Sequence, residues 1–130
     1  MNEMLNTMMR SVLEQDRASV VICDLNHTII YMNPAAIRNY AKRGGKELWG
    51  KNLLDCHNEH SVEIIKKVVA WFQESNDNNM IYTYKDEKHN KDEYMVALRD
   101  ENKQLLGYYE KHEHRNPETA QRYDFSKSLV

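Results

Sequence analysis

Two groups of side chains in this sequence are of types that bind metals or move protons. Cys56, His57 and His60 lie close together, just before a long amphipathic segment. A thiolate or an imidazole there can ligate a metal ion or a haem iron, and His57 is the candidate axial ligand. The alternative is that His57 caps the segment or hydrogen-bonds a backbone carbonyl, while Cys56 is a small buried side chain. The sequence leaves both interpretations open.

The second group is a pair of histidines, His112 and His114, in a segment that we expect to be a strand. Alternate residues of a strand point to the same face, so both imidazoles would share one face. Zinc usually takes three or four ligands, so Cys56 or His57 would have to complete such a site. The alternative is a solvated pair at a strand end. The candidate metal ligands are therefore His57, His60, His112 and His114.

Sequence signatures of catalysis are absent. There is no glycine-rich phosphate loop, no Gly-x-Ser-x-Gly motif and no His-Glu-x-x-His motif. A nucleophile pair made of Cys56 and His57 is conceivable, but adjacent residues rarely point in the same direction. We expect a protein that is not an enzyme.

Composition and charge argue against further classes of protein. The chain has 130 residues and a formal net charge of −2, with acids and bases interspersed, so no nucleic-acid partner is expected. A mean hydropathy of −0.83 and the absence of a long apolar run argue against a membrane span. No signal peptide is recognisable, so Cys23 and Cys56 are expected to be free thiols in a reducing cytoplasm.

Apolar spacing and turn residues predict the elements that position these groups. Strands in two groups with helices between them favour an α+β fold, in which helices gather on one face of an antiparallel sheet. Asn33 is expected to cap the helix that begins at Pro34. The predicted elements are, in order, an amphipathic helix at 1–16, strands at 19–23 and 28–32, short helices at 34–41 and 46–49, a long helix at 61–73, strands at 80–85, 93–100 and 104–112, and a tail at 113–130.

The helix at 1–16 has an apolar, methionine-rich stripe that needs a partner. It packs either on the sheet or on another chain, so a homodimer is one expected outcome. In the tail, Tyr123 and Phe125 are the candidates for docking onto the domain at 17–112.

Three motifs in order along the chain resemble the PAS domain family, and the resemblance covers residues 17–111. It implies a five-stranded antiparallel sheet in the order 2-1-5-4-3, with helices on one face around a small cavity. Proteins of this family are usually sensors. The motifs are Asp24-Leu25-Asn26 with Ile29-Ile30-Tyr31-Met32-Asn33-Pro34-Ala35-Ala36, Glu47-Leu48-Trp49-Gly50-Lys51-Asn52-Leu53-Leu54, and Arg99-Asp100-Glu101-Asn102 with Leu105-Leu106-Gly107-Tyr108.

At some positions the sequence resembles one subset of the PAS family, and at others it departs from the family pattern. Cys56-His57 ahead of the long helix resembles a subset of bacterial PAS domains, and some PAS domains bind haem through a histidine near this helix. Lys103 stands where the family usually has glycine. Residues 113–115 replace the closing Asp-Ile-Thr that often passes the signal to a following helix. Output is therefore expected through dimer rearrangement or a partner protein. Cys56 lies three positions beyond the place of the reactive cysteine in light-sensing relatives, so a covalent flavin photocycle is not expected.

The resemblance implies that a ligand would lie between the sheet and the long helix. We expect a sensory module that binds a small molecule there; the alternatives are a haem or metal sensor using His57, and an interaction module without a ligand. Packed core is the other explanation for the same apolar residues. The candidate cavity residues are Cys56, His57, Ile22, Ile30, Leu53, Leu54, Ile65, Tyr82, Met95 and Tyr108.

Overall fold

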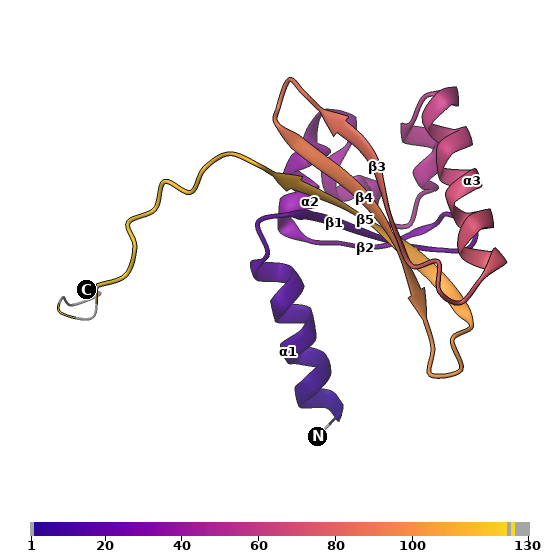
Figure 1. Cartoon of the computed structure of the whole chain (residues 1–130), viewed down its shortest axis with the longest axis horizontal. Coiled ribbons are helices and arrows are strands. Elements are labelled where there is room, and N and C mark those ends of the chain that lie inside the picture. Colours follow the sequence, from indigo (N-terminus) through magenta and orange to yellow (C-terminus); the bar gives the residue numbers. More distant parts are fainter. Residues whose placement is uncertain (1, 125, 127–130) are drawn as a thin grey trace.

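The computed structural model of the chain describes residues 2–124 and 126, and its centre is one antiparallel sheet (Figure 1). The strand order is β2-β1-β5-β4-β3, and every neighbouring pair is antiparallel. The predicted α+β fold with the order 2-1-5-4-3 is confirmed. The strands are β1 (Ser19–Asp24), β2 (Ile29–Met32), β3 (Met80–Asp86), β4 (Lys91–Arg99) and β5 (Leu105–His114).

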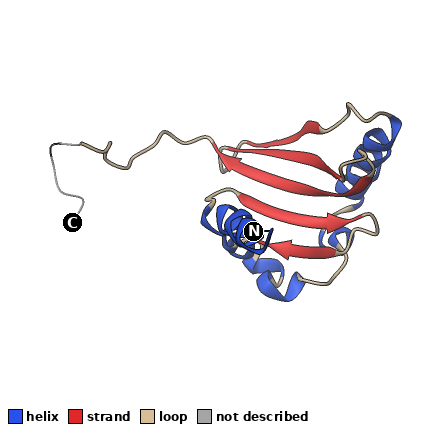
Figure 2. Ribbon diagram, turned by 90° about the horizontal axis from the view of Figure 1, so that it is seen from below, coloured by secondary structure: helices blue, strands red, loops and turns tan. Residues whose placement is uncertain are grey.

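Helices connect the two groups of strands and supply the second layer (Figure 2). The helix α1 projects away from the sheet (Figure 1), whereas α2 contacts β1 and α3 contacts β4 and β5. None of the described helices is long and apolar enough to cross a membrane. The helices are α1 (Asn2–Gln15), α2 (Pro34–Asn39) and α3 (Glu59–Glu74), with short 3₁₀ turns η1 (Ala41–Arg43), η2 (Gly45–Leu48) and η3 (Leu53–Cys56).

The core lies between α3 and the inner face of the sheet. Strand side chains alternate between the two faces, and those of Val21, Cys23, Met95 and Tyr108 point inward and are buried. The apolar stripe of α3 packs onto them through Ile65, Val68, Val69 and Phe72. This packing fixes the position of α3 above β4 and β5, and the N-terminal turn of α3 therefore stands over the part of the sheet that carries polar residues.

Asn33 joins three parts of the fold, and the predicted cap is confirmed. Its Oδ1 accepts hydrogen bonds from the backbone N–H of Ala36, in the first turn of α2, and of Val20, in β1, each at 2.9 Å. Its Nδ2 donates to the carbonyl oxygens of Leu13, in α1, and Ala18, at 3.0 and 2.9 Å. The side chain is fully buried, so one amide holds the end of α1, the start of the sheet and the start of α2 together.

Several element boundaries differ by one or two residues from those expected from the sequence, and two of these differences bear on the site. The helix α3 begins at Glu59 rather than at residue 61, because Asn58 caps it by accepting a hydrogen bond from the N–H of Ser61 at 2.9 Å. The strand β5 runs two residues beyond 112, to His114, because its backbone stays paired with β4. Tyr123 is 47% exposed and its docking stays a prediction, while Phe125 lies outside the described residues.

Candidate functional site

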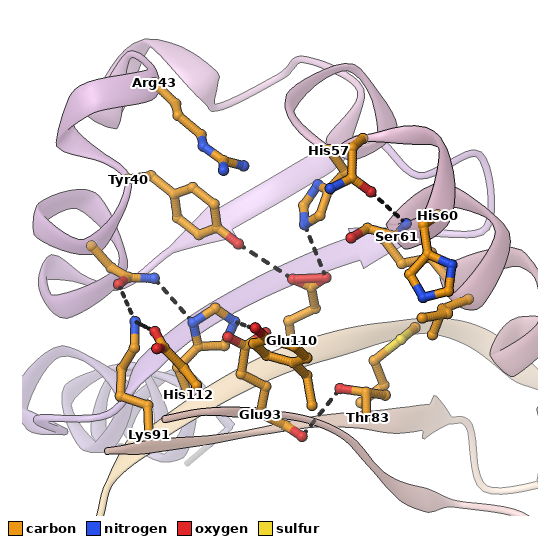
Figure 3. A pocket seen from close by; sticks show the side chains of 17 residues that line it. Tyr40, Arg43, His57, His60, Ser61, Thr83, Lys91, Glu93, Glu110 and His112 are labelled. Carbon is orange, nitrogen blue, oxygen red and sulfur yellow. Dashed lines mark hydrogen bonds and ion pairs between the residues drawn. The ribbon is translucent and has the colours of Figure 1, made fainter. Parts of the chain in front are cut away.

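A cavity of about 590 Å³ lies between the inner face of the sheet and the N-terminal turn of α3 (Figure 3). Its walls are mostly polar: three of its 17 lining residues are aliphatic or methionine, namely Ile64, Ile65 and Met95. Cavities of this size accommodate small organic ligands. The polar and charged lining residues are Asn39, Tyr40, Arg43, His57, Asn58, His60, Ser61, Thr83, Tyr84, Asp86, Lys91, Glu93, Glu110 and His112.

A bulge in β3 turns two of these side chains toward the cavity. The pairing of β3 with β4 shifts register between Tyr82 and Tyr84. A bulge adds one residue to one strand, so the residues beyond it point to the opposite face from the one that simple alternation gives. Tyr84 and Asp86 therefore share the face of Glu93 and line the cavity, while Tyr82 points to the outer face.

The carboxyl group of Glu110 lies at the centre of the cavity floor, between Tyr40 and His57 (Figure 3). Glu110 is 7% exposed. Its Oε2 accepts a hydrogen bond of 3.4 Å from the hydroxyl of Tyr40, and its Oε1 lies 3.8 Å from Nε2 of His57. Both distances are longer than those of strong charge-assisted hydrogen bonds, so the buried carboxyl retains capacity to accept further hydrogen bonds.

His57 is oriented by the backbone of η3. Its Nδ1 lies 2.9 Å from the carbonyl oxygen of Leu53, which only accepts, so Nδ1 carries a hydrogen and donates it. The opposite nitrogen, Nε2, faces Glu110. It carries a hydrogen only when the ring is protonated. The sequence had offered capping or a backbone hydrogen bond as one alternative for His57, and the structure has the backbone hydrogen bond.

A second chain of polar contacts ends at Glu93. Lys91 Nζ donates to Asn39 Oδ1 at 3.0 Å, which places the amide nitrogen of Asn39 against Nδ1 of His112 at 3.1 Å. That ring nitrogen therefore accepts, and a neutral His112 carries its hydrogen on Nε2, which lies 3.4 Å from Glu93 Oε1. The neutral ring can thus donate toward the carboxyl of Glu93.

Burial shifts the pKa values of these groups in opposite directions. Desolvation and the nearby charge of Glu110 raise the pKa of Glu93 to about 7, and desolvation raises the pKa of Glu110 against the influence of His57 and Tyr40. Desolvation and the positive charge of Lys91 lower the pKa of His112 to about 3. Near neutral pH the cavity floor therefore holds the neutral imidazole of His112 beside the carboxyl of Glu93, which is then partly protonated.

The structure brings part of the predicted site together. His57, His60, Ile65, Met95 and His112 line the cavity, with His60 at its solvent-exposed edge. His114 lies outside this cavity, in a smaller basic depression with Arg17, Arg38 and Lys91. His112 lines both depressions, so the two histidines share the smaller one and only His112 reaches the cavity.

Other predicted wall residues lie elsewhere. Ile30 and Tyr82 are 51% and 53% exposed on the outer face of the sheet, and Ile22 shares that face, since it pairs with Tyr31 while its neighbours Val21 and Cys23 point inward. Their assignment to the wall was wrong, because the phase of the alternation puts Ile29 and Ile81 on the core side instead.

The remaining predicted wall residues belong to the core. Leu53 and Tyr108 are fully buried, and Leu54 packs against the same cluster. The hydroxyl of Tyr108 lies 2.8 Å from Nδ1 of His27, which satisfies it within the protein. These side chains support the floor and do not line it.

The described part of the chain contains no group of three or more His, Cys, Asp or Glu side chains that could hold a metal ion. The cysteine predicted beside His57 turns away from the cavity: Cys56 Sγ donates to the carbonyl oxygen of Leu53 at 3.0 Å. A haem would need an extended apolar slot, and the charged walls described above do not fit one. The lining of this cavity therefore does not fit a haem.

The sequence analysis missed the two carboxylates, Glu93 and Glu110, the hydroxyl of Tyr40 that donates to Glu110, and Arg43 at the rim of the cavity. Glu110 lies two residues before His112 and two after Tyr108, so strand alternation places all three on one face. That spacing was the available signal. It was overlooked because charged residues on strands are usually solvated.

Comparison with known proteins agrees with the fold. A family model described as the PAS domain matches residues 5–112. The PAS domain of a Colwellia psychrerythraea protein is similar in structure, with a TM-score of 0.65 and 16% identity over 85% of this chain and 96% of that one. A C-terminal domain from Streptococcus mutans has the same TM-score and identity over 84% of each chain.

Another similar structure is that of a sensory box sensor histidine kinase from Vibrio cholerae, with a TM-score of 0.53 and 16% identity over 87% of this chain and 95% of that one. No curated protein matches the sequence. At these identities the structural likeness establishes the fold and says nothing about a ligand.

Proposed function

Because this chain belongs to the PAS domain family, whose domains are sensory modules of signalling proteins and generally not catalytic, we propose that it senses a small polar molecule bound in the cavity between the sheet and α3. Binding would change how the domain contacts a second copy or a partner protein. The observation that carries the proposal is the cavity of about 590 Å³ with inward-facing hydrogen-bonding groups.

The character of the walls supports a ligand rather than a collapsed core. A core of packed apolar side chains would leave no such space and would not place a buried carboxyl at its centre. Here Glu110, His57 and Glu93 come from three different elements and line one cavity (Figure 3). A ligand with several hydrogen-bonding groups would satisfy them and exclude water from the cavity.

A panel of metabolites tests this proposal through thermal unfolding. A ligand that binds only the folded state stabilises it, by about 2.7 kcal/mol when its concentration is 100 times the dissociation constant. The variant Ser61→Trp fills the cavity from the first turn of α3, and Glu63→Trp, on the solvent side of the same helix, is the matched control. We expect at least one compound that raises the melting temperature of the wild type and of Glu63→Trp but not of Ser61→Trp.

Two results would contradict the proposed sensory site. If no compound in a panel that spans neutral, anionic and cationic molecules stabilises the wild type, or if Ser61→Trp leaves the stabilisation unchanged, the cavity is not a sensory site. The alternative of an interaction module without a ligand would then be favoured.

For the output, we propose that α1 mediates homodimer formation. Five apolar side chains of this helix are more than half exposed: Met4, Leu5, Met8, Met9 and Val12. Such a stripe on a 14-residue helix is a large apolar surface for a small domain. Two copies of the stripe would pack against each other across a two-fold axis, as in helix pairs that bury apolar seams. The C-terminal end of α1 is fixed to the domain through Asn33, which also caps α2, and α2 ends at Asn39, a residue of the cavity lining.

We expect the wild type to be a dimer at micromolar concentration and the double variant Met8→Glu, Val12→Glu to be a monomer, because charges in the seam are costly to bury. Light scattering coupled to gel filtration measures the mass. Asn6→Glu, which also adds a charge to α1 but replaces a polar residue, is the control and should remain dimeric. A wild type that is monomeric at high concentration would contradict the proposed dimer.

A further inference from the structure

We propose that the ligand of this cavity is a cationic amine whose ammonium group binds between the carboxylates of Glu93 and Glu110. This inference rests on the proposed function, since it concerns the same cavity, and it names the chemical class of the molecule.

The two carboxyl groups lie close enough to share one ligand. Glu110 pairs with Met95 and Glu93 pairs with His112 across the β4–β5 ladder, so Glu93 and Glu110 are diagonal neighbours on the inner face. Diagonal neighbours lie about 7–8 Å apart at their backbones, within reach of long side chains. A single ammonium donates up to three hydrogen bonds and would satisfy both carboxylates.

Among the described residues no lysine or arginine forms an ion pair with either acid, and the charge of Lys91 favours the ionised form of Glu93 only from a greater distance. Their recorded polar partners on the cavity floor are the hydroxyl of Tyr40 and the imidazoles of His57 and His112. Buried carboxylates of like charge repel each other and are normally paired with a cation or protonated. A ligand cation would relieve the repulsion between the two carboxylates. Their negative charge would also repel an anionic ligand.

The two cations that line the cavity are already engaged. Arg43 is an exposed residue at the rim of the cavity. Its guanidinium donates a hydrogen bond to the carbonyl oxygen of Cys56. Lys91 donates to Asn39 at 3.0 Å and lies 3.9 Å from Asp86 Oδ2. Asp86 therefore offsets the charge of Lys91 at one end of the cavity, and the carboxyl groups of Glu93 and Glu110 are left without a direct lysine or arginine partner among the described residues.

The proposal also gives a pH dependence. Burial and the charge of Glu110 raise the pKa of Glu93 to about 7, so this carboxyl must lose its proton before it pairs with an ammonium. Affinity for the amine should therefore rise as the pH increases from about 6 to 8, with protons released on binding. The charged and titratable groups that face the two carboxyls, and that act on the same equilibrium, are Tyr40, His57, Asp86, Lys91 and His112.

Three probes that differ only in the head group test the inference: 2-phenylethylamine, 2-phenylethanol and 3-phenylpropanoate. We measure their affinities for the whole protein at pH 8 by isothermal titration calorimetry or NMR titration. The amine should bind at least ten times more tightly than the alcohol and the acid. Glu93→Gln and Glu110→Gln should each reduce its affinity at least tenfold and leave the affinity for the alcohol nearly unchanged.

Glu113→Gln is the matched control, because Glu113 lies on β5 but faces the opposite side of the sheet, where it pairs with Lys111 and Arg115. It should bind the amine like the wild type. An amine that binds no better than the alcohol, including one that does not bind at all, overturns the inference. If other compounds still bind in the manner blocked by Ser61→Trp, the sensory cavity stands and only the cationic class is wrong.

Discussion

Asn33→Ala is expected to lower the free energy of unfolding by about 3 to 5 kcal/mol, since it leaves two buried N–H groups and two carbonyl oxygens without their partner. Those groups belong to Val20, Ala36, Leu13 and Ala18. Urea unfolding followed by circular dichroism measures the change. Because the amide also holds the end of α1, the variant should loosen that helix relative to the sheet.

Asn58→Ala is the control for this prediction. Asn58 caps α3 in the same way but is exposed, so its loss should cost only about 1 kcal/mol. If Asn33→Ala is no more destabilising than Asn58→Ala, then Asn33 is an ordinary helix cap and does not join the three elements.

Glu93→Gln is expected to stabilise the protein at pH 8, by about 1 to 2 kcal/mol, and to change little at pH 5. The folded pKa of Glu93 is raised from 4.5 to about 7, so in the wild type its contribution to stability is present below pH 4.5 and is lost as the pH rises through 7. Glutamine does not ionise, so the variant does not lose this stability as the pH rises. The figure is smaller than the full shift implies, because Glu93 is partly open to solvent, which screens its charge.

Urea unfolding of both proteins from pH 5 to 8 measures the difference. Glu113→Gln should behave in the opposite way: hydrogen bonds from Lys111 and Arg115 lower the pKa of Glu113, so its removal should destabilise the protein at pH 8. A Glu93→Gln variant that is no more stable than the wild type at pH 8 would show that burial does not raise this pKa.

The fold was predictable from the sequence because its signals are local. The cap at Asn33, the amphipathic pattern of α3 and the five β-rich segments each predict one element. The order of the motifs then resembled that of one family. Element ends were less predictable, since they depend on distant contacts: β5 continues to His114 because it stays paired with β4.

The candidate site was harder to predict, because it depends on which face each strand residue occupies. The bulge in β3 reverses that phase between Tyr82 and Tyr84, and no residue in the sequence marks it. Glu110 looked like a solvated charge, since the element that covers it, the start of α3, is far away in the sequence. His57 was singled out by its type, yet its role depends on Leu53 O and Glu110, which only the fold brings to it.

The most direct test of a ligand in the cavity is an NMR titration of the ¹⁵N-labelled protein with the compound that stabilises it most. We predict that the largest amide shifts fall on residues around the cavity, such as His57, Glu93 and Glu110, and that Ser61→Trp abolishes them. Shifts confined to the outer face, at Ile30, Tyr82 and Glu113, or to α1, would contradict a sensory site between the sheet and α3.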